Sequence, residues 1–105
     1  MAVVISDSMT PEFEWDAKKA NENFKNHGVA FEEGLTVFGD PLARIFDDPD
    51  HSEGERRELI IGHSAKQRLL VVSFTERKPR TRIIGARKAT AHERHDYEEN
   101  THTKT

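Results

Sequence analysis

At 105 residues, with 34% hydrophobic and 33% charged residues, the chain has room for one domain around a modest core. It contains no cysteine, which excludes disulfides, thiolate nucleophiles and cysteine-based zinc sites. Its first ten residues contain no basic region and only a short apolar run, so we expect no signal peptide, no membrane span and a cytoplasmic location.

Charge is distributed unevenly along the chain, although the net charge is only −3. Residues 56–94 hold 11 Lys and Arg against 3 acids, a balance of +8, and the remainder holds 5 against 16, a balance of −11. This segregation is typical of an anion-binding face on an acidic body. The alternative is a solvated surface on which distant segments interleave their charges after folding.

The N-terminal part of the chain predicts a short strand followed by a helix. Residues 1–10 have no usable period and predict a flexible tail, whereas residues 13–15 alternate apolar and polar and predict an edge strand. Asp16 is then a good N-cap for a helix that ends near Asn26, with Gly28 just beyond its end.

A second helix is predicted after Ala30, a residue that caps poorly, because apolar residues recur at i, i+4 and i+7 from Phe31. Residues 39–41, Gly-Asp-Pro, end it. Residues 42–46 alternate and predict a strand, and residues 47–55 form an acidic loop. The spacing of acids in this loop does not match a calcium-binding loop, so we expect no metal site.

Three strand-forming runs with polar connections follow, at residues 58–61, 69–74 and 82–86. The middle run is apolar on both faces and predicts a buried central strand. A last helix is expected from Thr90 towards Asn100, because Thr90 and Glu93 match a capping box. The predicted fold is therefore α+β, in one domain over residues 1–105: an antiparallel sheet with two N-terminal helices packed on it, a short C-terminal helix and a flexible tail at residues 101–105.

Arginines near the ends of these strands are the first candidate functional residues. If the faces of the strands coincide, alternation brings Arg57, Arg77 and Arg87 together at one rim of the sheet. Guanidinium groups bind phosphate oxygens two at a time, so such a rim favours phosphate binding. Alternatively, the three form surface ion pairs. Their partners would then be Glu58, Glu76 and Glu93.

A polar stripe on the first predicted helix is the second candidate. Lys19, Asn23 and His27 are spaced i, i+4 and i+8, which stacks them on one side. His27 is suited to acid or base work and Lys19 to phosphate binding, although a His at this position also stabilises a helix through its dipole. Tyr97, on the last helix, either stacks on a base, transfers a proton or docks the helix.

An ordered series of short motifs resembles the BrnT-type toxins, the ribonuclease half of bacterial type II toxin–antitoxin pairs. The likeness covers about residues 12–99. The motifs are FEWD (13–16), Lys19, Asn23, His-Gly-Val (27–29), FEE (31–33), VF-x-DP (37–41), Ile61-Gly62-x-Ser64, LLVVSFTER (69–77), RII-x-AR (82–87) and Glu93-Arg94-x-x-Tyr97-Glu98. Departures from the usual pattern are Asn26, where Lys is common, and Ala30 and Gly85, where Ser is common.

The resemblance implies a RelE-like fold and a metal-independent endoribonuclease that cleaves mRNA, needs no cofactor and is inhibited by a BrnA-type antitoxin. The antitoxin would carry a ribbon-helix-helix segment, so that operator DNA is bound only through it, in a complex such as a dimer or heterotetramer. Metal-independent RNA cleavage requires a base, cations that stabilise the phosphorane and an acid. The catalytic candidates are Lys19, His27, Arg57, Arg77, Arg87 and Tyr97, and the RNA-binding candidates are Asn23, Arg82, Lys88 and Arg94.

Two other functions stay open at this point. Asn26 and Gly85 favour a non-catalytic interaction or co-repressor module that binds a DNA-binding antitoxin. Direct DNA binding by the basic face is the weaker alternative, because little of the basic segment predicts a helix for a major groove.

Overall fold

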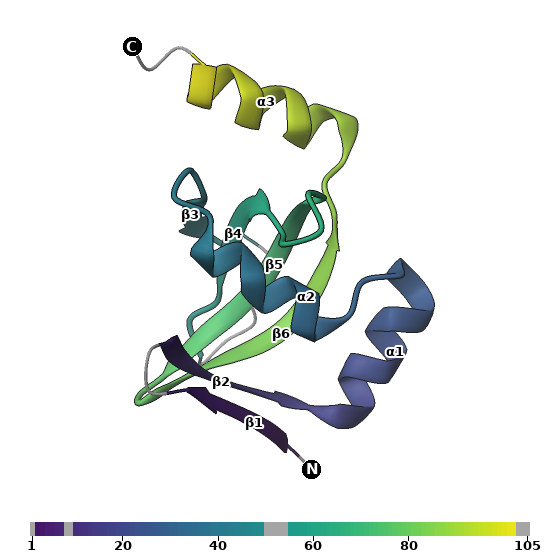
Figure 1. Cartoon of the computed structure of the whole chain (residues 1–105), viewed down its shortest axis with the longest axis vertical. Coiled ribbons are helices and arrows are strands. Elements are labelled where there is room, and N and C mark those ends of the chain that lie inside the picture. Colours follow the sequence, from purple (N-terminus) through teal and green to yellow (C-terminus); the bar gives the residue numbers. More distant parts are fainter. Residues whose placement is uncertain (1, 8–9, 50–54, 103–105) are drawn as a thin grey trace.

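The computed structural model describes residues 2–7, 10–49 and 55–102, which form one sheet with helices around it (Figure 1). The strands are β1 (Ala2–Asp7), β2 (Thr10–Asp16), β3 (Arg44–Asp47), β4 (Glu58–His63), β5 (Leu69–Arg77) and β6 (Arg80–Lys88). The helices are α1 (Ala17–His27), α2 (Phe31–Leu35), the 3-10 helix η1 (Thr36–Gly39) and α3 (Ala91–His102). No helix in this described part is both long and apolar enough to cross a membrane.

The strands lie in the order β1-β2-β6-β5-β4-β3. All neighbours are antiparallel except β2 and β6, which run parallel where Phe13 pairs with Thr81. The α+β class is confirmed, but the prediction of a purely antiparallel sheet is wrong at this one pair. Alternation within a strand reveals which face each residue occupies; it carries no information about the direction of the neighbour.

The N-terminal residues differ most from the prediction. Ala2–Asp7 forms β1, where the sequence predicted a tail, and its pairing of Val3 with Trp15 makes β2 an internal strand and not an edge strand. The expectations for residues 1, 8–9, 50–54 and 103–105 lie outside the described residues.

The ends of α1 follow the local signals in the sequence. The Asp16 side chain accepts hydrogen bonds from the N–H groups of Lys18 and Lys19, at 2.8 and 3.1 Å. Gly28 has a φ of +69°, and its N–H donates to the carbonyl of Phe24. Only glycine adopts this left-handed conformation without strain, so α1 ends here and the chain turns back over the sheet.

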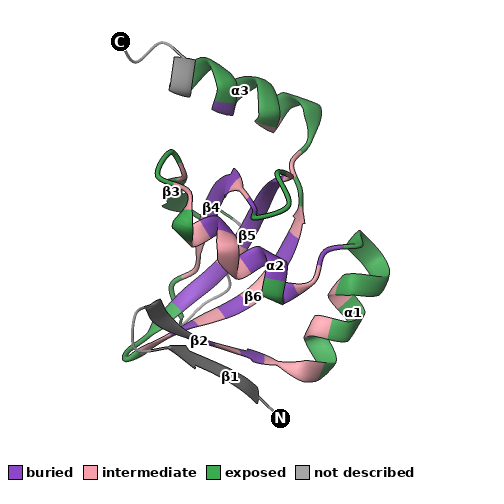
Figure 2. Ribbon diagram, viewed as in Figure 1, coloured by how far each residue is buried: buried purple, intermediate pink, exposed green. Residues whose placement is uncertain are grey.

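The main core lies on one face of the sheet, which we call the helix face (Figure 2). Trp15 packs edge-on against Phe31 with ring centroids 5.9 Å apart, and Phe38 contacts both Phe13 and Phe74. The opposite face, which we call the open face, is covered at one end by Tyr97 of α3, over a small cluster that includes Ile61 and Val71.

A β-bulge changes the face of part of β6. Ser73 pairs with Gly85 but Phe74 pairs with Ile83, so the register skips one residue of β6. Strict alternation along β6 would put Ile83, Gly85 and Arg87 on one face, but because of the bulge Ile83 is buried on the helix face. Gly85 and Arg87 lie on the open face, opposite Ser73 and Val71.

A buried carboxylate joins α2 to the turn between β4 and β5. Glu33 is 7% exposed and accepts hydrogen bonds from Ser64 Oγ at 2.7 Å, Arg68 Nε at 2.9 Å and Arg68 Nη2. The hydrogen bond from Arg68 lowers the pKa of Glu33 against the opposing effect of burial. These hydrogen bonds hold the turn between β4 and β5 against α2. Arg68 also donates to the carbonyl of Gly28, between α1 and α2.

We expect Glu33→Gln to reduce the free energy of unfolding by about 2–3 kcal/mol, because Arg68 and Ser64 lose a charged acceptor. Urea denaturation measures this. The matched control is Glu32→Gln, at an exposed neighbouring position, which should cost no more than about 0.5 kcal/mol. Equal losses for the two variants would contradict a structural role for the buried carboxylate.

Candidate active site

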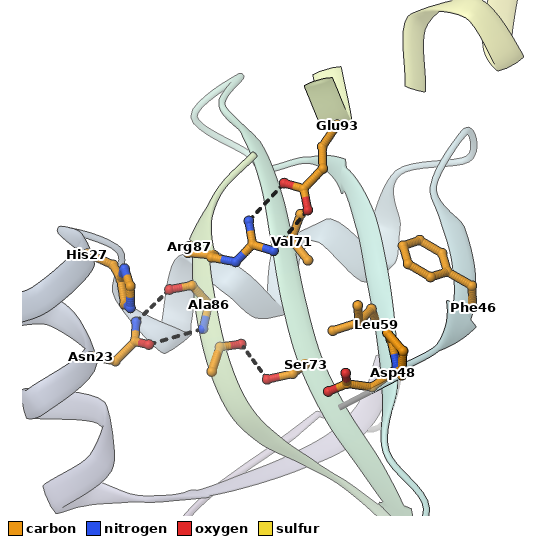
Figure 3. A pocket seen from close by; sticks show the side chains of 12 residues that line it. Asn23, His27, Phe46, Asp48, Leu59, Val71, Ser73, Ala86, Arg87 and Glu93 are labelled. Atoms are coloured by element: carbon orange, nitrogen blue, oxygen red, sulfur yellow. Dashed lines mark hydrogen bonds and ion pairs between the residues drawn. The ribbon is translucent and has the colours of Figure 1, made fainter. Parts of the chain in front are cut away.

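A cleft of about 510 Å³ crosses the open face beside the start of α3 (Figure 3). Strand side chains form its floor and residues from α1, the end of β3 and α3 form its walls. The lining residues are Asn23, His27, Phe46, Asp48, Pro49, Leu59, Val71, Ser73, Gly85, Ala86, Arg87 and Glu93. A side chain at Gly85 would approach Ser73 Oγ to 3.0 Å, so glycine keeps the floor low at the centre of the cleft.

Arg87 and Glu93 form a two-point ion pair at one end of the cleft. Arg87 Nη1 donates to Glu93 Oε1 at 2.8 Å, and Nη2 donates to Oε2 at 2.9 Å. Nη1 also donates to the carbonyl of Lys88 at 3.3 Å. Of the five N–H donors of a guanidinium, two remain, one on Nε and one on Nη2, and neither has a hydrogen-bond partner among the described residues.

These two donors lie along the same side of the guanidinium, and together they match two oxygens of a phosphate. In Figure 3 the guanidinium of Arg87 lies between Glu93 and Ser73, over the cleft. The ion pair therefore fixes the side chain while leaving one bidentate edge available for an anion.

Glu93 is held from two directions. It completes the predicted capping box, because the N–H of Thr90 donates to Glu93 Oε1 at 2.8 Å and the N–H of Glu93 donates to Thr90 Oγ1 at 3.1 Å. The hydrogen bond from Arg87, with a smaller contribution from Thr90, lowers the pKa of Glu93 to about 2 despite partial burial. Glu93 is therefore ionised at neutral pH and serves as a positioning residue for Arg87.

Tyr97 docks α3 onto the sheet. It is 4% exposed, its hydroxyl donates to Asp40 Oδ2 at 3.2 Å, and its ring meets that of His63 edge-on. Burial, followed by the charge of Asp40, raises the pKa of Tyr97 to about 12. Tyr97 lies four residues after Glu93, on the same side of α3, so its docking also determines where Glu93 lies. Of the three roles predicted for Tyr97, docking of the helix fits this position, because Tyr97 does not line the cleft.

His27 reaches the cleft because Asn23 joins α1 to β6. The Asn23 amide donates to the carbonyls of Val29 and Ala86 at 2.9 and 2.7 Å, and its oxygen accepts from the N–H of Ala86 at 3.2 Å. The side chain thus pairs with β6 as a neighbouring strand would. Asn23 was predicted to bind RNA, but its amide is committed to the backbone. Lys19 is exposed on α1 and does not line the cleft.

Contrary to our prediction, Arg57, Arg77 and Arg87 do not converge. They share the open face, but Arg87 lies opposite Val71, and Arg77 lies six residues further along β5, about 20 Å away at the rise of a strand. Arg77 is at the C-terminal end of β5 and Arg87 at that of β6, and antiparallel strands put these ends at opposite sides of the sheet. Arg57 precedes β4 and lies at the same end as Arg77.

The other RNA-binding candidates also lie outside the cleft. Arg82 donates to Glu14 at 3.0 Å, Lys88 is exposed at the end of β6, and Arg94 lies 3.9 Å from Glu98 on α3. Of the predicted ion-pair partners, Glu93 pairs with Arg87. Arg77 pairs with Glu55, which was not among the predicted partners.

The pair of Arg87 with Glu93 was one of the two sequence alternatives for this arginine, and the capping box at Glu93 was predicted as well. Sequence reasoning missed the role of Asp40, which accepts from Tyr97. Asp40 carries no comparable signal, because its contacts with His63 and Tyr97 are distant in sequence. Among the described residues, no three His, Asp or Glu side chains are grouped so that they could hold a metal ion.

The pH dependence of stability tests the ion pair. Since the pKa of Glu93 falls from 4.5 to about 2 on folding, its contribution is complete above about pH 4.5 and is lost as the pH falls towards 2. We expect the difference in unfolding free energy between the wild type and Glu93→Gln to shrink over this window. A difference that stays constant between pH 6 and pH 2, measured by urea denaturation, would contradict the pair.

Hydrogen exchange tests the docking of α3. Tyr97→Phe removes the hydroxyl that donates to Asp40 but keeps the ring, so α3 should open more readily, by about 1 kcal/mol. We expect faster exchange of α3 amides with little change in β5. The matched control is His95→Ala, an exposed position on the same helix. Unchanged exchange in Tyr97→Phe would mean that the hydroxyl does not hold the helix.

Comparison with known proteins gives consistent results. Residues 15–93 match a family model described as the ribonuclease toxin, BrnT, of type II toxin–antitoxin systems. The fold is similar to the 1.1 Å crystal structure of the Brucella abortus ribonuclease toxin, BrnT, with a TM-score of 0.56 and 22% identity, over 72% of this chain and 92% of that chain. No curated protein matches the chain. Since the family model covers most of its residues, this chain belongs to the BrnT family of ribonuclease toxins, which are paired with a cognate antitoxin in type II toxin–antitoxin systems.

Proposed function

We propose that the chain is a metal-independent endoribonuclease that cleaves mRNA in the cytoplasm and so inhibits translation. The observation that carries this proposal is the free Nε and Nη2 edge of Arg87, held by Glu93 in a cleft that His27 also lines. Membership of a ribonuclease toxin family supports the reaction class. Arg87 and His27, which line the cleft, support the proposal as the cation and one proton-transfer group of such a reaction.

In the proposed reaction, two non-bridging oxygens of the scissile phosphate accept hydrogen bonds from Nε and Nη2 of Arg87. The ribose 2′-oxygen attacks phosphorus as its proton leaves, the bond to the 5′-oxygen breaks, and that oxygen takes up a proton. The products are a 2′,3′-cyclic phosphate and a 5′-hydroxyl. His27 provides one of these proton transfers, since imidazole is the side chain suited to acid or base work near neutral pH.

Arg87 contributes most when the phosphorane forms. The pair with Glu93 offsets part of its charge, which weakens binding of the substrate phosphate, but the transition state carries more negative charge than the ground state. Donors already in place for that charge stabilise the transition state selectively. Glu93 removes the need to order the long arginine side chain during the reaction.

We further propose that the fold is RelE-like and that a BrnA-like antitoxin with a ribbon-helix-helix segment inhibits the chain. Operator DNA would then be bound only through the antitoxin, in a dimer or heterotetramer. This part of the proposal rests on the sequence resemblance and on the membership of a type II family.

A second candidate function is a non-catalytic co-repressor. One observation favours it: Arg77, Arg82 and Arg87 each have a carboxylate partner, which reduces the cationic potential available to RNA. Cleavage by the purified protein discriminates the two functions.

Substitutions in the cleft test the first proposal. We expect Arg87→Ala and His27→Ala each to lower the rate of RNA cleavage in EDTA by about 10²–10³-fold. Arg87→Lys should not restore the rate, because an ammonium group lacks two parallel donors. The matched control is Arg44→Ala, which removes an exposed arginine of β3. The measurement is the initial rate on labelled RNA, with the fold of each variant checked by thermal unfolding.

Three results would each count against part of the proposal. Wild-type protein that never cleaves RNA would favour the co-repressor. Cleavage abolished by EDTA would refute metal independence. Equal rates for wild type, Arg87→Ala and Arg44→Ala would place the chemistry outside this cleft.

A further inference from the structure

The open face carries a second cationic region, at the end opposite α3. It consists of Arg57, Arg77 and Arg82, and we call it the basic end. Thr75 pairs with Arg82 and Phe74 pairs with Glu58, so Arg57 and Arg82 flank Thr75 in one row across the sheet. Arg77 lies two residues further along β5, in a later row on the same face. The three arginines therefore share a face with the cleft.

Carboxylates compensate only part of this charge. Arg82 Nη1 donates to Glu14 at 3.0 Å and Arg77 Nη2 donates to Glu55 at 3.0 Å, whereas no carboxylate among the described residues forms an ion pair with Arg57. The pair of Arg77 with Glu55 is half-exposed, and ion pairs of this kind contribute little, whereas the pair of Arg82 with Glu14 is partly buried. The basic end thus keeps a positive balance.

Arg57 shows the clearest sign of a missing ligand. Its Nε is buried, and it has no hydrogen-bond partner within the described parts of the chain. A buried donor of this kind costs free energy unless an acceptor occupies the position. Arg57 lies in the same row as Arg82, so one anion over Thr75 would be close to both guanidinium groups.

The surface between the cleft and the basic end suits an extended strand of nucleic acid. Ser73 and Gly85, on the floor of the cleft, lie between Arg87 and the basic end, and the rows of Arg87 and Arg82 are four residues of β5 apart, about 13 Å. Phe46, which is 47% exposed, offers a ring to an unpaired base at the wall of the cleft. Cationic tracks beside exposed aromatic rings are typical of single-strand binding.

We propose that the basic end binds backbone phosphates of a single-stranded RNA on one side of the scissile phosphate. This inference rests on the proposed ribonuclease function, which it extends to the shape of the substrate. Arg57 and Arg82 hold the flanking phosphate, whereas Arg87 and His27 act on the bond that breaks. The enzyme therefore favours substrates long enough to span both regions.

The test compares two substrates. A dinucleoside monophosphate contains only the scissile phosphate, whereas an RNA of about ten nucleotides reaches the basic end. We expect Arg57→Ala to lower kcat/KM by about tenfold more on the longer RNA than on the dinucleotide, mainly through KM. Arg82→Gln, a second variant on the other side of Thr75, should act in the same direction, and thermal unfolding checks the fold of both variants.

Arg56→Ala is the matched control. Arg56 precedes Arg57, and its side chain is 73% exposed and pairs with Asp47 at 2.8 Å. Only its backbone carbonyl contacts Thr75, and Arg56→Ala keeps that carbonyl. This variant should affect both substrates alike. Binding is also measured with an uncleavable all-deoxy strand of the same length at several salt concentrations. The slope of log K against log salt concentration should be smaller by about 0.7 for Arg57→Ala.

The outcomes separate this inference from the proposed function. The basic end is not a phosphate site if the wild type cleaves RNA but Arg57→Ala and Arg82→Gln lower kcat/KM equally on both substrates. The same holds if they lower kcat/KM no more than Arg56→Ala does. Weaker antitoxin binding in these variants with unchanged strand binding would assign the region to an acidic peptide and overturn the inference. If the wild type cleaves nothing, the proposed function fails, and binding of the deoxy strand still decides whether the basic end holds phosphate.

Discussion

The ion pair between Arg87 and Glu93 is the interaction on which the candidate active site depends. It joins β6 to α3, and it fixes Arg87 while leaving the Nε and Nη2 donors available. Its geometry depends in turn on α3, whose only buried residue among those described is Tyr97. The contact between Tyr97 and Asp40 therefore supports the geometry of the candidate site without being part of it.

The division of the sheet into two faces explains where function can lie. The helix face is covered by the aromatic core from β2, α2 and η1. On the open face, α3 covers only one end, so strand side chains line a cleft and a cationic track. Glycine and serine at the centre of this face keep it low, and arginines at both ends give it a positive charge.

Local signals in the sequence predicted local structure well. The cap at Asp16, the left-handed Gly28 and the capping box at Thr90 each depend on a few neighbouring residues, and all three were identified. The parallel pairing of β2 with β6, the bulge between β5 and β6 and the separation of Arg77 from Arg87 depend on which strands meet and in which register. Alternation identifies the face of a side chain, but it does not give its position along the sheet. The arginines were therefore placed on one face correctly and at one rim wrongly.

The most direct measurement is a crystal structure with a dinucleotide whose 2′-hydroxyl is methylated, so that it binds without being cleaved. The account predicts two phosphate oxygens at about 2.7–2.9 Å from Nε and Nη2 of Arg87, with Glu93 still paired and His27 next to the 2′- or 5′-oxygen. A phosphate bound elsewhere, with the Arg87 edge in contact only with protein or water, would contradict it.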